Sequence, residues 1–283
     1  MTTTGRTVGK QPVPPLPGTA RLALVRGAVE LRQFWRERDA VVFVFAYPVA
    51  MLAVFCTVFE GTEQGDRGVA VDYAQYFLPG MIATGIMLTS FQALATSIAV
   101  ERDDGTLRRL RGTPLPAASY LGGKVVLTLV TSTLQTTLLL GVAAVVHDVA
   151  MPSEVSRWAT FAVVYVLGAA TGAACGVAFA SLPRSGRSAS TVVIPVAVVL
   201  QLVSGVFLPF FALPGWIQAL ASVFPLKWLA QGMRAVFLPD AAAAWETGGS
   251  WQVGTVAAVL SAWLVLSVAV AVRTFRWRRR DDG

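Results

Sequence analysis

The sequence contains few of the residues on which metal sites and disulfides depend. Its 283 residues include two Cys and one His. Zinc is held by three or four ligands, usually Cys, His or carboxylates, so His147 beside Asp148 predicts a polar pair and no metal site. Cys56 and Cys175 fall inside long apolar segments rather than in aqueous loops, and we expect both to be packed thiols.

Charge is also scarce, at 14% of residues, and no Asp or Glu lies in the interior of a long apolar segment. An ion-driven carrier or a membrane-embedded enzyme needs ionisable groups that face a cavity. Lys124 is near enough to the end of its segment that we expect its amine to reach the membrane surface. The scarcity of such groups therefore argues against a secondary carrier and against a lipid transferase, which stay as alternatives for this chain.

A nucleotide-binding loop is missing as well. The phosphate-binding pattern G-x-x-x-x-G-K-[ST] requires Ser or Thr directly after the lysine. Gly9-Lys10 is followed by Gln, and Gly123-Lys124 is followed by Val. We therefore expect no cofactor in this chain.

What the chain has in abundance is apolar sequence: 55% of its residues are hydrophobic, and the mean hydropathy is +0.62. A helix needs about 20 apolar residues to cross a bilayer. Uncharged segments of that length predict an all-α integral membrane protein whose transmembrane domain covers 41–272. The predicted spans are about 41–59, 73–100, 121–147, 158–182, 189–211 and 252–272.

The distribution of positive charge predicts the orientation. Four segments, 1–40, 101–119, 183–188 and 273–283, hold 18 of the 23 Lys and Arg residues. Because cytoplasmic loops are enriched in these residues, we expect both termini on the cytoplasmic side of the cell (plasma or inner) membrane. The net charge of +7 is then a signal of topology, and no nucleic acid partner is needed to explain it.

The two ends of the chain predict peripheral elements. Forty residues precede the first apolar segment, so we expect an uncleaved anchor and no cleavable signal peptide. Residues 1–19 are rich in Pro and predict a flexible tail, and residues 273–283 predict a basic cytoplasmic tail that binds the membrane surface. Over 20–40 one helical face predicts an amphipathic helix in the cytoplasmic interface, through Leu24, Ala28, Leu31 and Trp35.

The densest block of charge lies between the second and third spans. Gly105 and Thr106 supply a break and an N-cap, Leu107 and Leu110 stand three residues apart, and Pro114 ends the turn. This order predicts a short amphipathic helix that lies along the cytoplasmic membrane surface.

The segment 206–226 is apolar enough for a seventh span, but three Pro residues interrupt it. A seventh span would also place the arginine-rich tail outside. We therefore predict that span five is followed by an interfacial or re-entrant helix on the outer face. The residues assigned to this outer gate are Gly205, Pro209, Pro214, Trp216 and Pro225.

Span four carries Gly168, Gly172 and Gly176 at intervals of four residues. Such a ridge lets another helix approach closely. The spacing leaves open whether that helix belongs to the same chain or to a second subunit.

Two blocks of the sequence resemble the ABC-2 family of transporter permeases. Residues 101–110 read E-R-D-D-G-T-L-R-R-L and are followed by Thr113-Pro114, which is similar to the family pattern E-R-x-x-G-T-L-x-x-L…T-P. A second block is similar at Ser204–Pro209, Leu213–Trp216, Phe224–Leu226 and Gly232–Arg234. The likeness covers nearly the whole chain and is greatest to small antibiotic exporters of the daunorubicin-resistance type.

This resemblance implies that the loop helix is a coupling helix that docks on a separate cytoplasmic ATPase subunit, which binds ATP and Mg²⁺. Two permease subunits, identical or closely paralogous, would enclose a path lined by spans one, two and five. The family often has Glu at the position of Asp103. The side chain of Asp103 is shorter, which argues against a direct salt bridge from it to the ATPase. The residues implied for coupling are Glu101, Asp103, Gly105, Thr106, Leu107, Arg108, Arg109, Leu110 and Pro114.

A path without acidic side chains favours a hydrophobic or amphiphilic small molecule, antibiotic-like and exported outward, because a permanent cation would want a countercharge. A polysaccharide or lipid-linked glycan exporter of the same family is the alternative. The predicted path residues are Phe45, Tyr47, Phe55, Thr84, Phe91, Gln92, Gln201 and Phe207.

Overall fold

The computed structural model describes residues 17–66, 68–183 and 185–274. Within them, six helical segments are long and apolar enough to cross a membrane, which confirms the predicted all-α membrane fold. Most of the two predicted tails, 1–16 and 275–283, lies outside the described residues. The six segments are α2 (Arg38–Val58), α3 with η1 and α4 (Tyr73–Asp103), α6 (Ala117–Val146), α7 (Val155–Phe179), α8 (Gly186–Val203) and α11 (Val253–Thr274).

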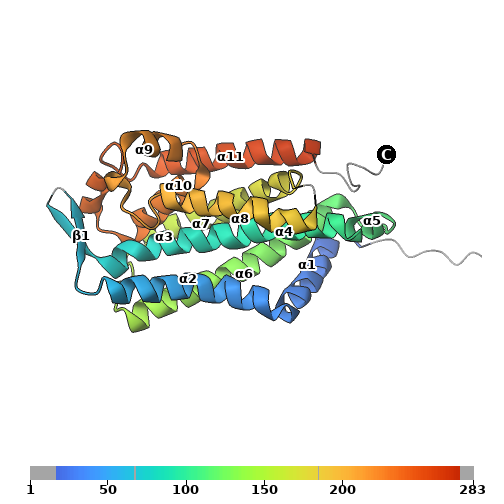
Figure 1. Ribbon diagram of the computed structural model, residues 1–283, viewed down its shortest axis with the longest axis horizontal. Coiled ribbons are helices and arrows are strands. Elements are labelled where there is room, and N and C mark those ends of the chain that lie inside the picture. The colour runs from blue at the N-terminus through green and yellow to red at the C-terminus, as the bar shows by residue number, and fades with distance from the viewer. Residues whose placement is uncertain (1–16, 67, 184, 275–283) are drawn as a thin grey trace, which may run out of the picture.

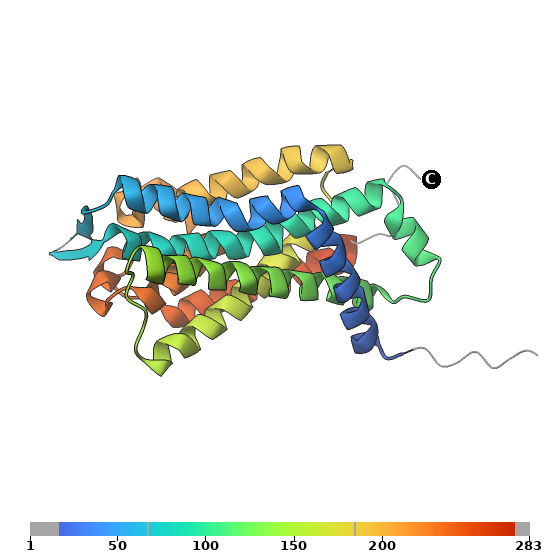
Figure 2. The ribbon, with the colours of Figure 1, turned by 90° about the horizontal axis from the view of Figure 1, so that it is seen from below.

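The six segments run along the long axis of the molecule, and shorter elements gather at its two ends (Figure 1). At one end, here called the hairpin end, β1 (Glu63–Asp66) pairs antiparallel with β2 (Val69–Asp72), and α9 (Gly215–Ala221) lies nearby. At the opposite end, here called the α5 end, α5 (Thr106–Arg111) projects beyond the bundle. Figure 2 shows α1 (Thr19–Arg36) lying obliquely across this end.

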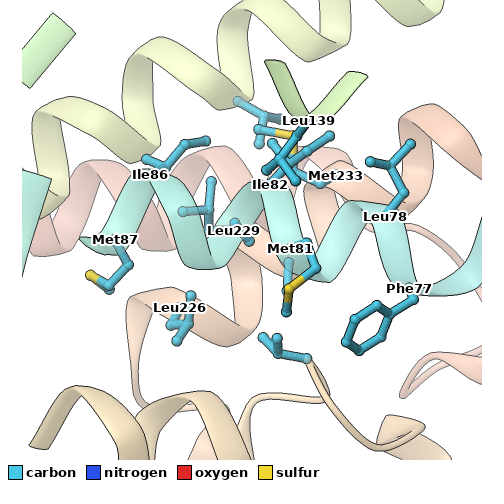
Figure 3. Packing of buried hydrophobic residues seen from close by; sticks show 14 of the residues in the cluster. Phe77, Leu78, Met81, Ile82, Ile86, Met87, Leu139, Leu226, Leu229 and Met233 are labelled. Carbon is cyan, nitrogen blue, oxygen red and sulfur yellow. The ribbon is translucent and has the colours of Figure 1, made fainter. Parts of the chain in front are cut away.

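Span two is the central helix of the bundle. Its first part, α3 (Tyr73–Met87), is buried along almost its whole length and contacts α2, α6, α7 and α10 (Pro225–Phe237). Apolar side chains on all faces suit this position but do not decide it, since α2 is also apolar on all faces and only 22% of it is buried. Figure 3 shows Phe77, Leu78, Met81 and Ile82 among Leu139 of α6 and Leu226, Leu229 and Met233 of α10.

Halfway along span two the helix forms one π turn, η1 (Leu88–Gln92), before it continues as α4 (Ala93–Asp103). Side chains bond the carbonyl groups at this turn: Thr89 Oγ1 donates to the carbonyl oxygen of Gly85 at 2.9 Å, and Ser90 Oγ to that of Ile86 at 2.5 Å. Hydroxyl groups can in this way satisfy backbone acceptors where the regular helical bonds change.

The glycine ridge of α7 packs within the chain. Gly168 faces Leu229 of α10, and Gly172 and Gly176 face Ser90 and Phe91 of η1. A Cβ atom at Gly172 would lie 2.0 Å from Ser90 Oγ, and one at Gly176 would lie 2.9 Å from the Phe91 carbonyl oxygen. The close approach that the spacing indicates is therefore made to the π turn and to α10.

The N-terminal helix α1 packs on α6 through small residues. Gly27 faces Val126, and Gly122 of α6 faces Ala23. The apolar stripe of the sequence lies beside this packed face and is largely uncovered, with Leu24 62% and Trp35 49% exposed. The helix ends at Arg36, and α2 begins at Arg38, so the segment 20–40 contains a break at Glu37 rather than one continuous helix.

After span five the chain differs from the prediction in two ways. α8 ends at Val203, eight residues before the predicted boundary at 211, and the chain turns at Gly205, whose φ is +72°. Two helices follow instead of one, separated after Ala221. α9 begins after its N-cap Pro214 and leaves Trp216 70% exposed, whereas α10, with Pro225 at its first turn, is buried on nearly every side.

Candidate functional site

The predicted coupling segment forms a turn followed by a short helix. α4 ends at Asp103, and Gly105 adopts a left-handed conformation with φ of +79°, which glycine reaches without a steric penalty. Asp104 Oδ1 accepts a hydrogen bond from the backbone N–H of Thr106 at 2.8 Å. The N-cap position is therefore held by Gly105, and Thr106 is the first residue of α5 rather than its cap.

The surface of α5 is basic. Arg108, Arg109 and Arg111 are exposed, and Arg109 Nη2 donates to Thr106 Oγ1 at 3.0 Å. Leu107 is only 1% exposed, so this chain already covers the side chain that was expected to fill an apolar contact with a partner.

The remaining predicted coupling residues lie around this helix. Leu110 is half-buried, and its carbonyl accepts from Thr113 Oγ1 at 2.6 Å. Pro114 is exposed beyond the end of α5. Asp103 is half-buried and lies beside Gly186 at the start of α8.

Glu101 belongs to a buried charge cluster at the root of α5. Its carboxylate accepts from Tyr120 Oη at 2.7 Å and pairs with Lys124 Nζ, both on α6. Lys124 Nζ also pairs with Glu30 of α1 at 2.8 Å, and Glu30 in turn pairs with Arg26. We call Arg26, Glu30, Glu101 and Lys124 the α5-end cluster; it joins α1, α4 and α6 and contains two positive and two negative charges.

The expectation that the amine of Lys124 reaches the membrane surface is wrong. Its side chain is 0% exposed, because the carboxylates of Glu30 and Glu101 and the hydroxyl of Ser97, 2.8 Å away, hold the amine inside. The sequence gives one signal for this: Arg26 and Glu30 stand four residues apart on the face of α1 opposite to its apolar stripe.

Four of the predicted path residues form two contact pairs, one between α2 and α8 and one between α2 and the turn after α8. Tyr47 Oη donates to Gln201 Oε1 at 3.4 Å. The ring of Phe55 stacks on Phe77 at 4.9 Å and lies 6.0 Å from Phe207. An aromatic and amide-bearing face is thus formed between α2 and α8.

The other four path residues do not join that face. Thr84 and Phe91 are buried inside the bundle, so neither side chain reaches a surface of this chain. Phe45 stacks on Trp35 of α1 at 5.8 Å, toward the α5 end. Gln92 is half-buried in η1.

A second buried charge cluster, which the sequence analysis missed, lies at the hairpin end. Arg234 Nε donates to Glu246 Oε1 at 2.5 Å, and Arg234 Nη1 donates to the carbonyl oxygen of Gly205 at 3.1 Å. Lys227 Nζ donates to Gln231 Oε1 one turn away on α10. We call Lys227, Arg234 and Glu246 the hairpin-end cluster; each of the three is at most 5% exposed.

This cluster contains two positive charges and one negative charge. Burial lowers the pKa of Lys227 to about 8, and the nearby Glu246 carboxylate only partly opposes that shift. The residues were overlooked because they lie outside the six apolar segments; the signal that could have found them is their spacing, since Lys227, Gln231 and Arg234 fall on one face of a helix. Among the described residues, no group of three or more His, Cys, Asp or Glu could hold a metal ion.

Comparison with known proteins agrees with this architecture. The chain is 25% identical over 171 residues to the probable multidrug ABC transporter permease YbhR of Escherichia coli. The aligned region is 60% of this chain and 46% of YbhR. It therefore spans about half the length of that relative. The chain is also 24% identical over 197 residues to the putative transport permease YvfS of Bacillus subtilis, and that aligned region is 69% of this chain and 77% of YvfS. The model of the ABC-2 type transporter family matches residues 24–238, from α1 to the end of α10, and the chain belongs to that family.

Proposed function

We propose that this chain is the membrane subunit of an ATP-binding cassette exporter. It moves a hydrophobic or amphiphilic small molecule outward, and a separate ATPase subunit supplies the energy by hydrolysing ATP. Membership of the ABC-2 type transporter family and the likeness to two transport permeases support this class of function.

The observation that carries the proposal is the attachment of α5. The helix presents exposed arginines at the end of the central span, and the α5-end cluster ties its root to α1 and α6. A partner that displaces α5 would therefore move three helices together instead of bending a loop. Rigid-body motion of packed elements is a common way to transmit such a displacement.

In this proposal the α5 end faces the cytoplasm, where Lys and Arg concentrate. Two permease subunits and two ATPase subunits form the working unit. Because α2 and α8 are only 22% and 28% buried, their outer faces are available to lipid or to the second permease, and the aromatic face between them lies at that boundary.

The decisive experiment is co-expression with a candidate cytoplasmic ATPase subunit of the ATP-binding cassette type. Reversing Arg108 and Arg109 to Glu should abolish co-purification of the ATPase and ATP-driven accumulation of amphiphilic dyes in inside-out vesicles. Reversal of two exposed arginines of α1, Arg32 and Arg36, is the matched control and should leave both unchanged. Leu107→Asp would not test docking of the ATPase, because Leu107 is buried in this chain and the substitution would disturb its own packing.

Export by the isolated chain without nucleotide would overturn the proposal. So would export that stops when the proton gradient is collapsed while ATP is maintained, since that is the behaviour of a secondary carrier.

A further inference from the structure

A small cavity lies at the hairpin end, among the short helices that follow span five. Its walls come from span two, α10, η2 (Phe210–Ala212), η3 (Asp240–Trp245) and the loop before α11. The centre of a water molecule can occupy about 10 Å³ of this cavity, which is the room that one water needs. The cavity therefore suits a ligand the size of a single water molecule.

Three residues of the cavity wall each carry a buried polar atom that lacks a partner. Arg234 Nη2, Trp251 Nε1 and Glu246 Oε2 make no hydrogen bond within the described part of the chain. Buried polar atoms are nearly always paired, because leaving one unpaired costs the full desolvation penalty. The first two atoms are donors and the third is an acceptor, so a ligand here must both accept and donate.

Other contacts hold these three residues in place. Arg234 Nε donates to Glu246 Oε1, and Arg234 Nη1 donates to the carbonyl oxygen of Gly205 at 3.1 Å. Gln231 Nε2 donates to the carbonyl oxygen of Trp251 at 2.9 Å, which anchors the backbone of that residue. Arg234 and Glu246 are only 3% and 5% exposed, so bulk solvent does not cover them. The site is therefore built before any ligand enters it.

We propose that this cavity binds one water molecule, which completes the hydrogen bonds of all three atoms. The water accepts from Arg234 Nη2 and from Trp251 Nε1 and donates to Glu246 Oε2, and about three bonds are usual for a buried water. A chloride ion fits less well. It could accept from the same two donors, but it would lie beside a carboxylate of the same sign of charge.

The bound water joins three segments of the chain. Arg234 belongs to α10, Glu246 follows η3, and Trp251 precedes α11. The ion pair already connects the first two, and the water adds the side chain of Trp251 to them. The start of span six is thereby fixed to α10. This role needs neither an ATPase nor a transported substrate, so its test is independent of the co-expression experiment.

Nuclear magnetic resonance of the full chain in nanodiscs, deuterated and isotope-labelled at its tryptophans, tests this site. The indole proton of Trp251 should show a cross-relaxation peak with water. Its sign should be that of a water that tumbles with the protein, which is opposite to the sign of proton exchange in the rotating frame. Trp251→Phe assigns the signal.

Three other tryptophans are internal controls. The Nε1 atoms of Trp158, Trp228 and Trp263 donate to carbonyl oxygens of this chain at 2.9, 2.7 and 2.8 Å. Their indole protons are therefore already paired within the protein, and they should show no such peak with water.

Ala242→Val separates a bound water from exchanging protons of the protein. Ala242 lines the cavity and is 0% exposed, so two added methyl groups fill the space and the peak should disappear. A peak relayed through exchanging protons of Arg234 or Tyr76 would persist. Ala241→Val is the matched control, since Ala241 lies in the same helix η3 but is exposed and outside the cavity. Should Ala242→Val not fold, the hydroxyl of Ala242→Ser should also displace the water.

Absence of the water peak at Trp251 would overturn the proposal, as would a peak with the sign of exchange or one that persists in folded Ala242→Val. Replacement of chloride by gluconate tests the competing ion. An unchanged Trp251 resonance supports water, whereas a shifted resonance assigns the cavity to chloride and overturns the proposal.

Discussion

The two ends of the bundle both bury charge, but they balance it differently. In the α5-end cluster, two cations face two carboxylates, and Lys124 of α6 is held by three groups from α1 and α4. In the hairpin-end cluster, Glu246 pairs with Arg234, and Lys227 has no carboxylate within salt-bridge distance among the described residues. The first arrangement is complete in its charges, whereas the second lacks a negative charge.

This difference separates a balanced junction between helices from a strained one. A buried ion pair contributes little net stability, but removing one partner is costly because the other charge is left uncompensated. A complete cluster therefore fixes the relative positions of α1, α4 and α6, which suits a part that transmits displacement. An incomplete cluster leaves Lys227 buried without a carboxylate partner, so its charge lowers stability instead of adding to it.

The largest effect should come from breaking the complete cluster. Lys124→Met leaves Glu30 and Glu101 buried side by side, and we expect it to lower the free energy of unfolding by about 5 kcal/mol. Thermal unfolding of the purified chain in detergent measures the loss. Adding Glu30→Gln and Glu101→Gln should restore much of it, and no recovery would show that the charges are not the cause.

Breaking the pair at the hairpin end should cost less, because a single carboxylate is left unpaired. For Arg234→Gln we expect a loss of about 3 kcal/mol, and for the double variant with Glu246→Gln a partial recovery. The same unfolding assay applies. A double variant no more stable than Arg234→Gln would contradict the pairing described here.

The sharpest test of the comparison is one substitution made at both ends. In contrast to Lys124→Met, Lys227→Met removes a buried cation that has no carboxylate partner of its own, so it should stabilise the chain by about 1 kcal/mol. A melting temperature that rises for Lys227→Met and falls for Lys124→Met supports the distinction. Destabilisation of similar size at both ends would remove it.

The smallest expected effect is a pH dependence confined to the hairpin end. Because burial lowers the pKa of Lys227 from 10.5 to about 8, the unfolded chain binds more protons than the folded chain between these two values, and stability rises with pH there. Glu246 and Arg234 are the other charged groups that act on it. The free energy of unfolding should rise by about 1 kcal/mol from pH 7 to pH 9, as measured by thermal unfolding in detergent, and Lys227→Met should flatten that profile.

The helical membrane fold could be predicted from the sequence because length and apolar composition decide whether a helix crosses a bilayer. Span five was extended too far, since residues 204–211 remain apolar after the helix has stopped, and only the left-handed Gly205 and the following Pro209 mark the turn. Apolar composition reports burial or lipid contact but not the path of the backbone.

The charge clusters could not be predicted in this way. Lys124 lies three residues into a predicted span, where a lysine can either extend to the surface or find buried partners. The deciding residue, Glu30, is 94 positions away in sequence. A contact between helices so far apart in the sequence produces no periodic pattern of residues. The buried position of Lys124, which depends on that contact, could therefore not be predicted.

The π turn of span two has a consequence for the phase of the helix that follows it. A one-residue expansion rotates every later side chain by about 100° relative to an uninterrupted α-helix. Glu101 comes after this offset and points toward Lys124, whereas deletion of one residue within Leu88–Gln92 would aim it elsewhere. The geometry at the membrane edge is thus set by a single supernumerary residue near the middle of the bilayer.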